Sequence, residues 1–136
     1  MKSYVLDSYA VLTYFQNEAG AEQVERLLEK AETREVNLFL SVVNLGEIVY
    51  ITQRKAGPEG KDSLLLALET LPVQLVEVTK DLALRAAEIK AAYPLAYADC
   101  FAAALGLARG VPVVTGDPEF KRIENLIAVE WLPHNR

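Results

Sequence analysis

The fold is decided by the stretch Leu95-Ala-Tyr-Ala-Asp-Cys-Phe-Ala-Ala-Ala-Leu-Gly-Leu-Ala-Arg-Gly110 and its continuation Val111-Pro-Val-Val-Thr-Gly-Asp117. The first part is apolar on almost every side, which predicts a buried helix that turns at Gly110 into a short buried strand. A helix joined to a strand by a short turn runs antiparallel to it. Asp99, in the first helical turn, and Asp117, just past the strand, are therefore expected on the rim of the sheet where open α/β folds bind ligands.

Outward from this unit, strand-like and helix-like segments alternate along the chain. Strands are expected at 3–6, 36–40, 74–78, 111–115 and 127–131. Besides the Ala-rich helix, helices are expected at 9–15, 21–33, 42–55, 64–71, 80–92 and 119–123, with Gly57-Pro58 and Pro72 as breaks. This alternation predicts an α/β fold, a three-layer α/β/α sandwich with a mostly parallel sheet of about five strands, in which residues 1–136 form one domain.

The composition excludes several kinds of protein. The chain has 136 residues, of which 51% are hydrophobic and 24% charged, and its longest apolar run is far shorter than a membrane span. Its single cysteine, Cys100, cannot form an intrachain disulfide, so we expect a cytoplasmic protein. The single histidine, His134, lies near the C-terminus, where we expect it to be exposed; it makes a histidine-based triad or a His/Cys zinc site improbable.

Four carboxylates follow the strand–helix pattern. Asp7 ends the first strand, Glu47 lies in the helix after the second, and Asp99 and Asp117 flank the fourth. Right-handed crossovers bring all four positions to one edge of the sheet. The helical neighbours of Glu47 and Asp99 are apolar, and burying a carboxylate there is costly unless a cation compensates. An all-oxygen ligand set favours Mg²⁺ or Mn²⁺.

Each of these acids also has a purely structural interpretation. Asp7 and Asp117 are residue types that cap helices and form turns, Glu47 is compatible with an interface, and Asp99 is compatible with a helix start. The same holds for other residues: Cys100 and Trp131 are expected in the core. Tyr9, Tyr14 and Phe15 suit either base stacking or packing. The coincidence of four acids at one rim favours the metal site.

A net charge of −5 weighs against a nucleic-acid partner, unless the carboxylates surround a metal ion that neutralises them locally. Cationic side chains that flank the predicted rim could then contact a phosphate backbone, although each also suits an ordinary solvated surface. These are Arg54, Lys55, Lys121 and Arg122.

At these residues the chain resembles a PIN domain, most closely the toxin subunit of VapBC-type toxin–antitoxin pairs. The matching segments are Tyr4-Val-Leu-Asp-Ser8, Ser41-Val-Val-Asn-Leu-Gly-Glu-Ile48, Leu95-Ala-Tyr-Ala-Asp-Cys-Phe-Ala-Ala-Ala-Leu105 and Val113-Val-Thr-Gly-Asp-Pro-Glu-Phe120. They occur in the family's order and extend over nearly the whole chain. Cys100 stands where the family usually has a small residue, which we interpret as packing.

The resemblance implies an endoribonuclease dependent on Mg²⁺ or Mn²⁺, with Asp7, Glu47, Asp99 and Asp117 as acidic residues and Ser8 and Thr115 as supporting hydroxyls. It also implies a homodimer that binds an antitoxin protein whose C-terminal segment fills the active-site groove. Phosphodiester hydrolysis by a metal-activated water needs no protein nucleophile, which suits this chain.

Two other classes of α/β protein with acidic rims fit poorly. A receiver domain needs paired acids after its first strand, and a dehalogenase-type phosphatase needs Asp-x-Asp there, whereas this chain has Asp7-Ser8-Tyr9. The remaining alternative is a catalytically silent PIN-like module that binds RNA or protein.

Overall fold

The computed structural model describes residues 1–133, so His134 lies outside the described residues. Five strands form one sheet in the order β3-β2-β1-β4-β5. Their bounds are β1 (Lys2–Leu6), β2 (Val36–Ser41), β3 (Gln74–Val76), β4 (Val113–Thr115) and β5 (Val129–Trp131). Every neighbouring pair is parallel, which confirms the predicted α/β class.

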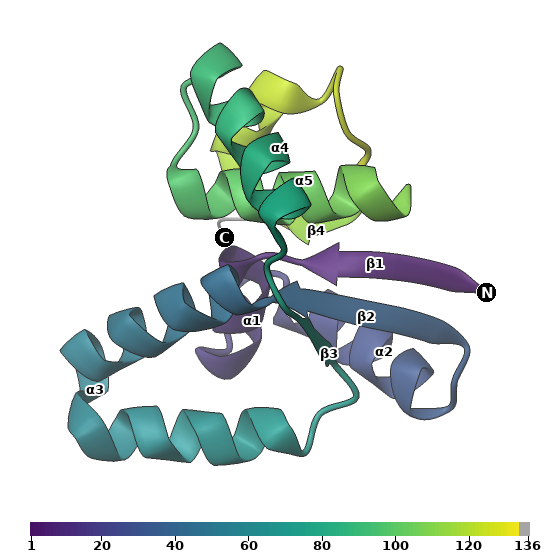
Figure 1. The fold of residues 1–136 in the computed structure, drawn as a ribbon. Helices are drawn as coiled ribbons and strands as arrows, with labels where there is room; N and C mark the ends of the chain where they lie inside the picture. The colour runs from purple at the N-terminus through teal and green to yellow at the C-terminus, as the bar shows by residue number, and fades with distance from the viewer. Residues whose placement is uncertain (134–136) are drawn as a thin grey trace.

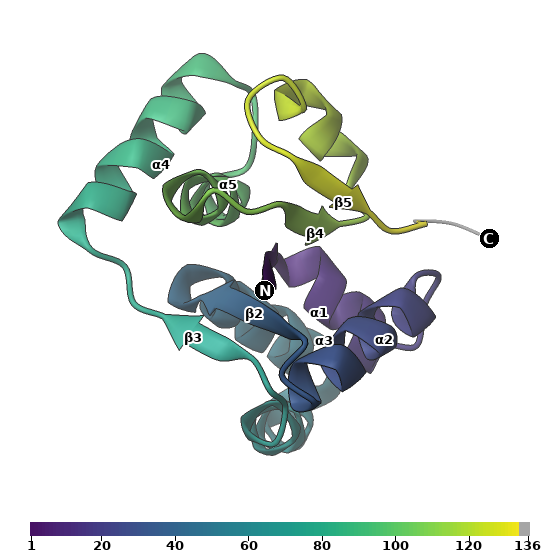
Figure 2. The ribbon, with the colours of Figure 1, turned by 90° about the vertical axis from the view of Figure 1, so that its right-hand side faces the viewer.

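Helices cover both faces of the sheet. On one face lie α1 (Ser8–Phe15), α2 (Ala21–Glu32) and α3 (Val42–Glu69) (Figure 1). On the other lie α4 (Lys80–Ala92), α5 (Tyr97–Arg109) and the 3-10 helix η1 (Pro118–Ile123) (Figure 2). The three predicted layers are therefore present.

The strands divide their apolar side chains between the two layers by the two-residue period of an extended chain. Val5, Phe39 and Val113 pack into the cluster formed with α4, α5 and η1. Leu6 and Val114, one residue further along β1 and β4, pack into the cluster formed with α1, α2 and α3. Strands buried on both faces read as continuous apolar runs, as expected for a parallel sheet.

Helix α5 is the most deeply buried helix, as its sequence predicts. Every residue from 100 to 106 is buried. The helix ends at Gly110, whose left-handed backbone (φ 66°) makes the turn toward β4. Gly106 lets the helix approach the strand, because a Cβ there would lie 2.9 Å from Val113 Cγ2 and 3.1 Å from the Val111 carbonyl oxygen.

The structure differs from the predicted elements in two places. The segments 42–55 and 64–71 belong to one kinked helix, α3, interrupted only at Gly57 (φ 74°). Glycine adopts this backbone freely and Pro58 is tolerated in a first helical turn, so the helix resumes at once. The last three strands are shorter than expected, and Trp131 is half-buried with its Nε1–H donating to Glu124 Oε2 at 2.8 Å.

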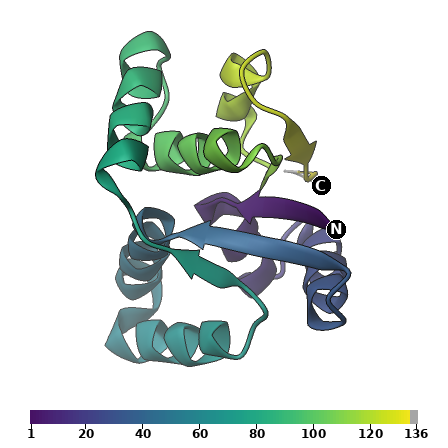
Figure 3. The ribbon, with the colours of Figure 1, turned by 45° about the vertical axis from the view of Figure 1, so that its right-hand side comes forward.

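The parallel strands all end at the same edge of the sheet. Figure 3 shows the arrowheads of β1 and β2 pointing the same way, toward the side where α3 and α5 begin. No single helix among residues 1–133 is long and apolar enough to cross a membrane; α4 and α5 pass that test only jointly, as a pair bent by 119°.

Two glycine substitutions test the packing of α5 on β4. Gly106→Ala should lower the free energy of unfolding by about 1–3 kcal/mol, because the added methyl group overpacks a closed contact. The control is Gly46→Ala on α3, where a Cβ meets nothing within 4 Å. It should stabilise the protein by roughly 0.5–1 kcal/mol through helix propensity. Urea denaturation measures both, and equal effects of the two variants would contradict the close approach.

Candidate metal centre

The first residues of helices carry the acidic side chains. Asp7 caps α1, its Oδ1 accepting a hydrogen bond from the Ala10 N–H at 2.8 Å. Asp117 caps η1, its Oδ1 accepting from the Glu119 N–H at 3.0 Å. Asp99 lies in the first turn of α5. The capping roles that the sequence suggests for Asp7 and Asp117 are thus real, but each cap uses only one carboxylate oxygen.

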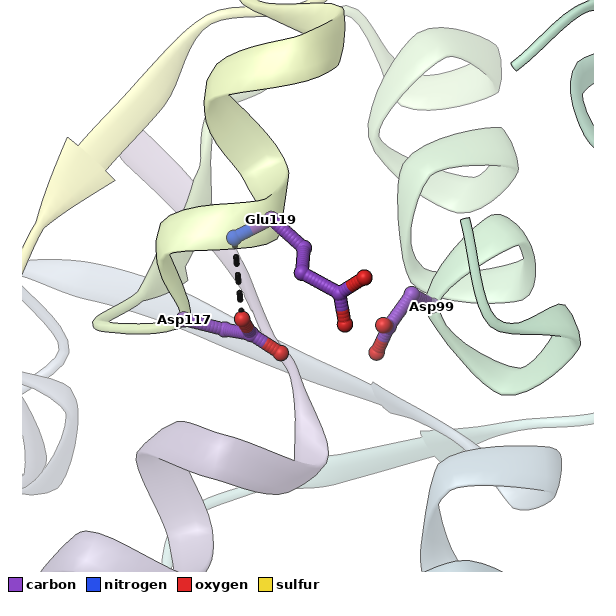
Figure 4. A group of neighbouring side chains, drawn as sticks. All are labelled: Asp99, Asp117 and Glu119. Atoms are coloured by element: carbon purple, nitrogen blue, oxygen red, sulfur yellow. Dashed lines mark hydrogen bonds between the residues drawn. The ribbon is translucent and has the colours of Figure 1, made fainter. Parts of the chain in front are cut away.

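Three carboxylates come close enough to share one ion. Asp99, Asp117 and Glu119 each offer an oxygen, and these oxygens all lie within 4.8 Å of one another. Figure 4 shows the side chain of Glu119 extending from η1 toward Asp99 on α5, with Asp117 beside them. We call these three residues the acidic cluster. Asp7 and Glu47 lie outside this closest group, and their assignment as metal ligands stays a prediction.

Glu119 is the ligand candidate that the sequence analysis missed. It opens the short helix predicted at 119–123, and the Asp117-Pro118-Glu119 turn could have indicated that its carboxylate lies beside that of Asp117. Arg122, one turn later, holds Glu119 in place: its Nη1 donates to Glu119 Oε1 at 2.7 Å and to the Pro94 carbonyl oxygen at 2.6 Å. Arg122 is thus partly committed within the protein.

Asp7 is fully buried, and its Oδ2 accepts no hydrogen bond among residues 1–133. Burial raises the pKa of its carboxyl from 3.8 to about 8. The Thr115 hydroxyl and the Ala10 N–H oppose this rise, while the charges of Asp99 and Asp117 add to it. A buried carboxylate with an unpaired oxygen is costly, and a nearby cation is the usual compensation.

Asp99 is 8% exposed, and its pKa rises to about 7. Burial is the largest cause, followed by the negative charges of Asp117, Glu47 and Glu119. Glu47 is therefore near enough to Asp99 to act on it, as the predicted convergence requires. The expectation that the neighbours of Glu47 are buried is only partly right, since Tyr50 is 48% exposed.

The two predicted hydroxyl residues connect the elements of the site. Thr115 Oγ1 accepts from the Asp117 N–H at 3.0 Å, which fixes the turn after β4. Ser8 is joined to a residue that the sequence analysis missed, Asn44 of α3. The Asn44 Nδ2 donates to Ser8 Oγ and to the Ala98 carbonyl oxygen, both at 3.1 Å. Asn44 thereby ties together the starts of α1, α3 and α5.

Other candidates proved structural. Cys100 is fully buried, which raises the pKa of its thiol and agrees with a packing role. Tyr14 and Phe15 are partly buried and meet edge to face with ring centroids 5.2 Å apart, so they pack rather than stack on a ligand.

The cluster fits a hard divalent cation. Its donors are all carboxylate oxygens, the ligands preferred by Mg²⁺ and Mn²⁺. Neighbouring negative charges raise the pKa of Asp99, so positive charge at this point would relieve a repulsion already present. Such an ion would be held by Asp99, Asp117 and Glu119, with Asp7 and Glu47 behind them.

Comparison with known proteins agrees with this geometry. Residues 4–126 match the model of the PIN domain family. The chain belongs to the PIN domain family. No curated protein matches it significantly.

Solved structures share the fold at low sequence identity. VapBC2 from Rickettsia felis, bound to a DNA fragment from its promoter, contains a chain 18% identical (TM-score 0.77), with 96% of this chain and 98% of that chain covered. DNA-bound VapBC from Salmonella typhimurium gives 21% identity and a TM-score of 0.76, with the same coverage. Mycobacterium tuberculosis VapC20, a Sarcin-Ricin loop cleaving toxin, is 17% identical with a TM-score of 0.68. The match covers 87% of this chain and 92% of that chain.

The buried carboxyl of Asp7 predicts a pH-dependent stability. Its folded pKa, about 8, lies above its ordinary 3.8, so its favourable contribution is complete below pH 4 and is lost as the pH rises through 8. Asp7→Asn keeps the helix cap and removes this titration. Between pH 4 and pH 8 the metal-free variant should gain about 2 kcal/mol or more relative to the native protein. Urea denaturation measures the free energy of unfolding of both proteins. The same pH dependence in the native protein and in Asp7→Asn would refute this prediction.

Metal binding should depend on pH in the opposite sense. Because Asp99 must lose its proton to bind a cation, Mn²⁺ affinity should fall as the pH drops through about 7. We expect roughly a tenfold loss per pH unit below that point, measured by calorimetric titration between pH 6 and pH 8. Asp99→Asn should bind weakly with a flatter profile, whereas Asp81→Asn, on an exposed part of α4, should behave as the native protein.

Proposed function

We propose that this protein is a metal-dependent endoribonuclease and the toxin of a type II toxin–antitoxin pair. The observation that carries the proposal is the acidic cluster of Asp99, Asp117 and Glu119 at the carboxyl edge of a PIN-family sheet, with Asp7 and Glu47 beside it. Side chains from both halves of the chain converge on this edge, and Arg122 is paired with Glu119 there.

The residues suit hydrolysis of a phosphodiester. A bound Mg²⁺ or Mn²⁺ supplies an acidified water as nucleophile and neutralises charge on the phosphate. Asp99, Asp117 and Glu119 would hold the ion, and Arg122 and the Asp117 cap fix two of these carboxylates in place. Asp7 is buried, its Oδ2 has no hydrogen-bond partner among residues 1–133, and its carboxylate could add to the ligands of such an ion. Thr115 and Ser8 would serve as supporting hydroxyls: Thr115 Oγ1 accepts from the Asp117 N–H, and Ser8 Oγ donates to the Asn44 carbonyl oxygen.

RNA is the substrate that we favour. The resemblance implies it, and one solved structure of the same fold is described as a Sarcin-Ricin loop cleaving toxin. The site also lies at the surface, since Asp117 is partly exposed and Glu119 is exposed, so a polymer has access.

An antitoxin is the partner that we favour, because several structures of this fold are VapBC complexes. An apolar groove between α1 and the two halves of α3 suits an apolar peptide segment; its lining includes Leu12, Phe15, Ala56 and Leu64. A homodimer is also part of the proposal, in accordance with the resemblance.

The cleavage assay separates this proposal from a catalytically silent binding module. The purified protein should cut a mixed pool of RNA in Mg²⁺ or Mn²⁺ and stop when EDTA is added. Asp99→Asn should reduce the rate by more than the roughly 10–100-fold that loss of a supporting residue costs. Glu119→Gln should reduce it strongly as well.

The matched control is Asp81→Asn, which removes one exposed carboxylate from α4 and should cut at the native rate. Circular dichroism should be unchanged in all three variants. RNA cleavage that survives both EDTA and Asp99→Asn would reject the metal mechanism. Binding of RNA or antitoxin without any cleavage in either metal would favour the silent module.

A further inference from the structure

An exposed aromatic ring and an arginine form a pair on α3. The guanidinium carbon of Arg54 lies 5.1 Å from the centroid of the Tyr50 ring, so the cation covers one face of the ring. Tyr50 is 48% exposed and belongs to neither hydrophobic cluster. Packing of the core therefore does not explain why an aromatic ring is displayed here.

Two other aromatic contacts differ from this pair. Arg109 covers Phe39 at 4.2 Å, but Phe39 is a core residue, so that cation closes the edge of the core. Tyr97 is exposed, yet it packs edge to face on the buried Phe101 at 4.9 Å. Tyr50 and Arg54 have no such connection to the interior.

The pair lies on the face of α3 that also carries Glu47, the predicted ligand whose charge acts on Asp99. Glu47, Tyr50 and Arg54 are spaced by three and four residues, so they occupy one face of α3. Glu47 is the first residue on this face, and its charge contributes to the raised pKa of Asp99. The helical rise places Arg54 about 10 Å along the axis from Glu47. An RNA strand that passes Glu47 can span this distance with its next nucleotides.

The charge of Arg54 is uncompensated. The three ion pairs within residues 1–133 engage Lys61, Arg85 and Arg122, each with a neighbouring carboxylate. Arg54 has none, and its neighbour Lys55 has none either. In a chain of net charge −5, an unpaired cation on the face of α3 that carries Glu47 suits an anionic ligand.

We infer that Tyr50 and Arg54 form a landing site for the single-stranded RNA flanking the cleaved bond, an inference that rests on the proposed function. A base stacks on the open face of the Tyr50 ring, and Arg54 donates hydrogen bonds to the adjoining phosphate. The ring holds the guanidinium in one orientation, so little side-chain freedom is lost on binding. Stacking on an aromatic ring tolerates any base, so the pair contributes affinity and register.

The experiment measures binding of a fluorescein-labelled single-stranded RNA of about ten nucleotides by anisotropy, in Mg²⁺, on the Asp99→Asn background that prevents cleavage. Tyr50→Ala should weaken binding about tenfold or more, whereas Tyr50→Phe, which keeps the ring, should stay close to the parent. Arg54→Gln should weaken binding and reduce the slope of log affinity against log salt by about 0.7, the value for one phosphate contact on a single strand.

The matched control is Arg26→Gln, which removes the same charge from an exposed position on α2 and should leave affinity and slope unchanged. RNA binding equal in Tyr50→Ala, Arg54→Gln and the parent would overturn the inference and leave the proposed nuclease intact. Unchanged RNA binding together with a shifted monomer–dimer equilibrium in Tyr50→Ala would assign this face to contact between copies instead. An Asp99→Asn parent that does not bind RNA, together with a native protein that does not cut it, would overturn both.

Discussion

The burial of carboxyl groups at one edge of the sheet governs this structure, and repulsion among these groups adds to its cost. Asp99 is nearly buried and senses the negative charges of Asp117, Glu47 and Glu119, and Asp7 is buried completely. Most folded proteins avoid such an arrangement, because each unneutralised buried charge costs stability. Here the layers of the fold hold the acids together despite that cost. Without a cation, the raised pKa values of Asp7 and Asp99 favour the neutral carboxyl groups, and a divalent cation would favour the charged ones.

Hydrogen bonds from neutral groups keep the geometry in place. Asn44 joins α3 to Ser8 and to the Ala98 carbonyl, so the helices that begin next to Asp7 and Asp99 cannot separate without losing at least one of these bonds. Thr115 fixes the turn that carries Asp117, and Arg122 links Glu119 to the loop before α5. The acids therefore sit in a frame built mainly by uncharged donors, with Arg122 as the cation in direct contact.

Much of the fold follows from local pattern. The strand–helix alternation predicts the parallel sheet, and the Ala-rich run with Gly110 predicts the buried helix α5 and its turn into β4. Strand lengths were less predictable, because apolar character continues beyond the residues that pair. The sequence predicts that the helix ends at Gly57, whereas the structure has a kink there and the helix continues. A glycine–proline pair does not reveal whether a helix resumes after it.

The site was predictable in position and less so in composition. Asp7, Glu47, Asp99 and Asp117 reach one edge because parallel strands end there, which the order of elements dictates. Glu119 was not predicted, because the direction of its side chain depends on the 3-10 helix that follows Asp117. Asn44 was not predicted, because its two hydrogen-bond partners lie 36 and 54 residues away in the chain. Side-chain direction and long-range pairing are properties of the packed structure rather than of local sequence.

The central place of β1 in the sheet has a consequence for synthesis. This first strand is paired with β2 on one side and with β4, more than a hundred residues later, on the other. A chain still emerging from the ribosome without β4 and η1 lacks Asp117 and Glu119, so the cluster cannot assemble. If this protein is harmful to the cell that makes it, the order of its strands postpones that harm until β4 and η1 have been synthesised.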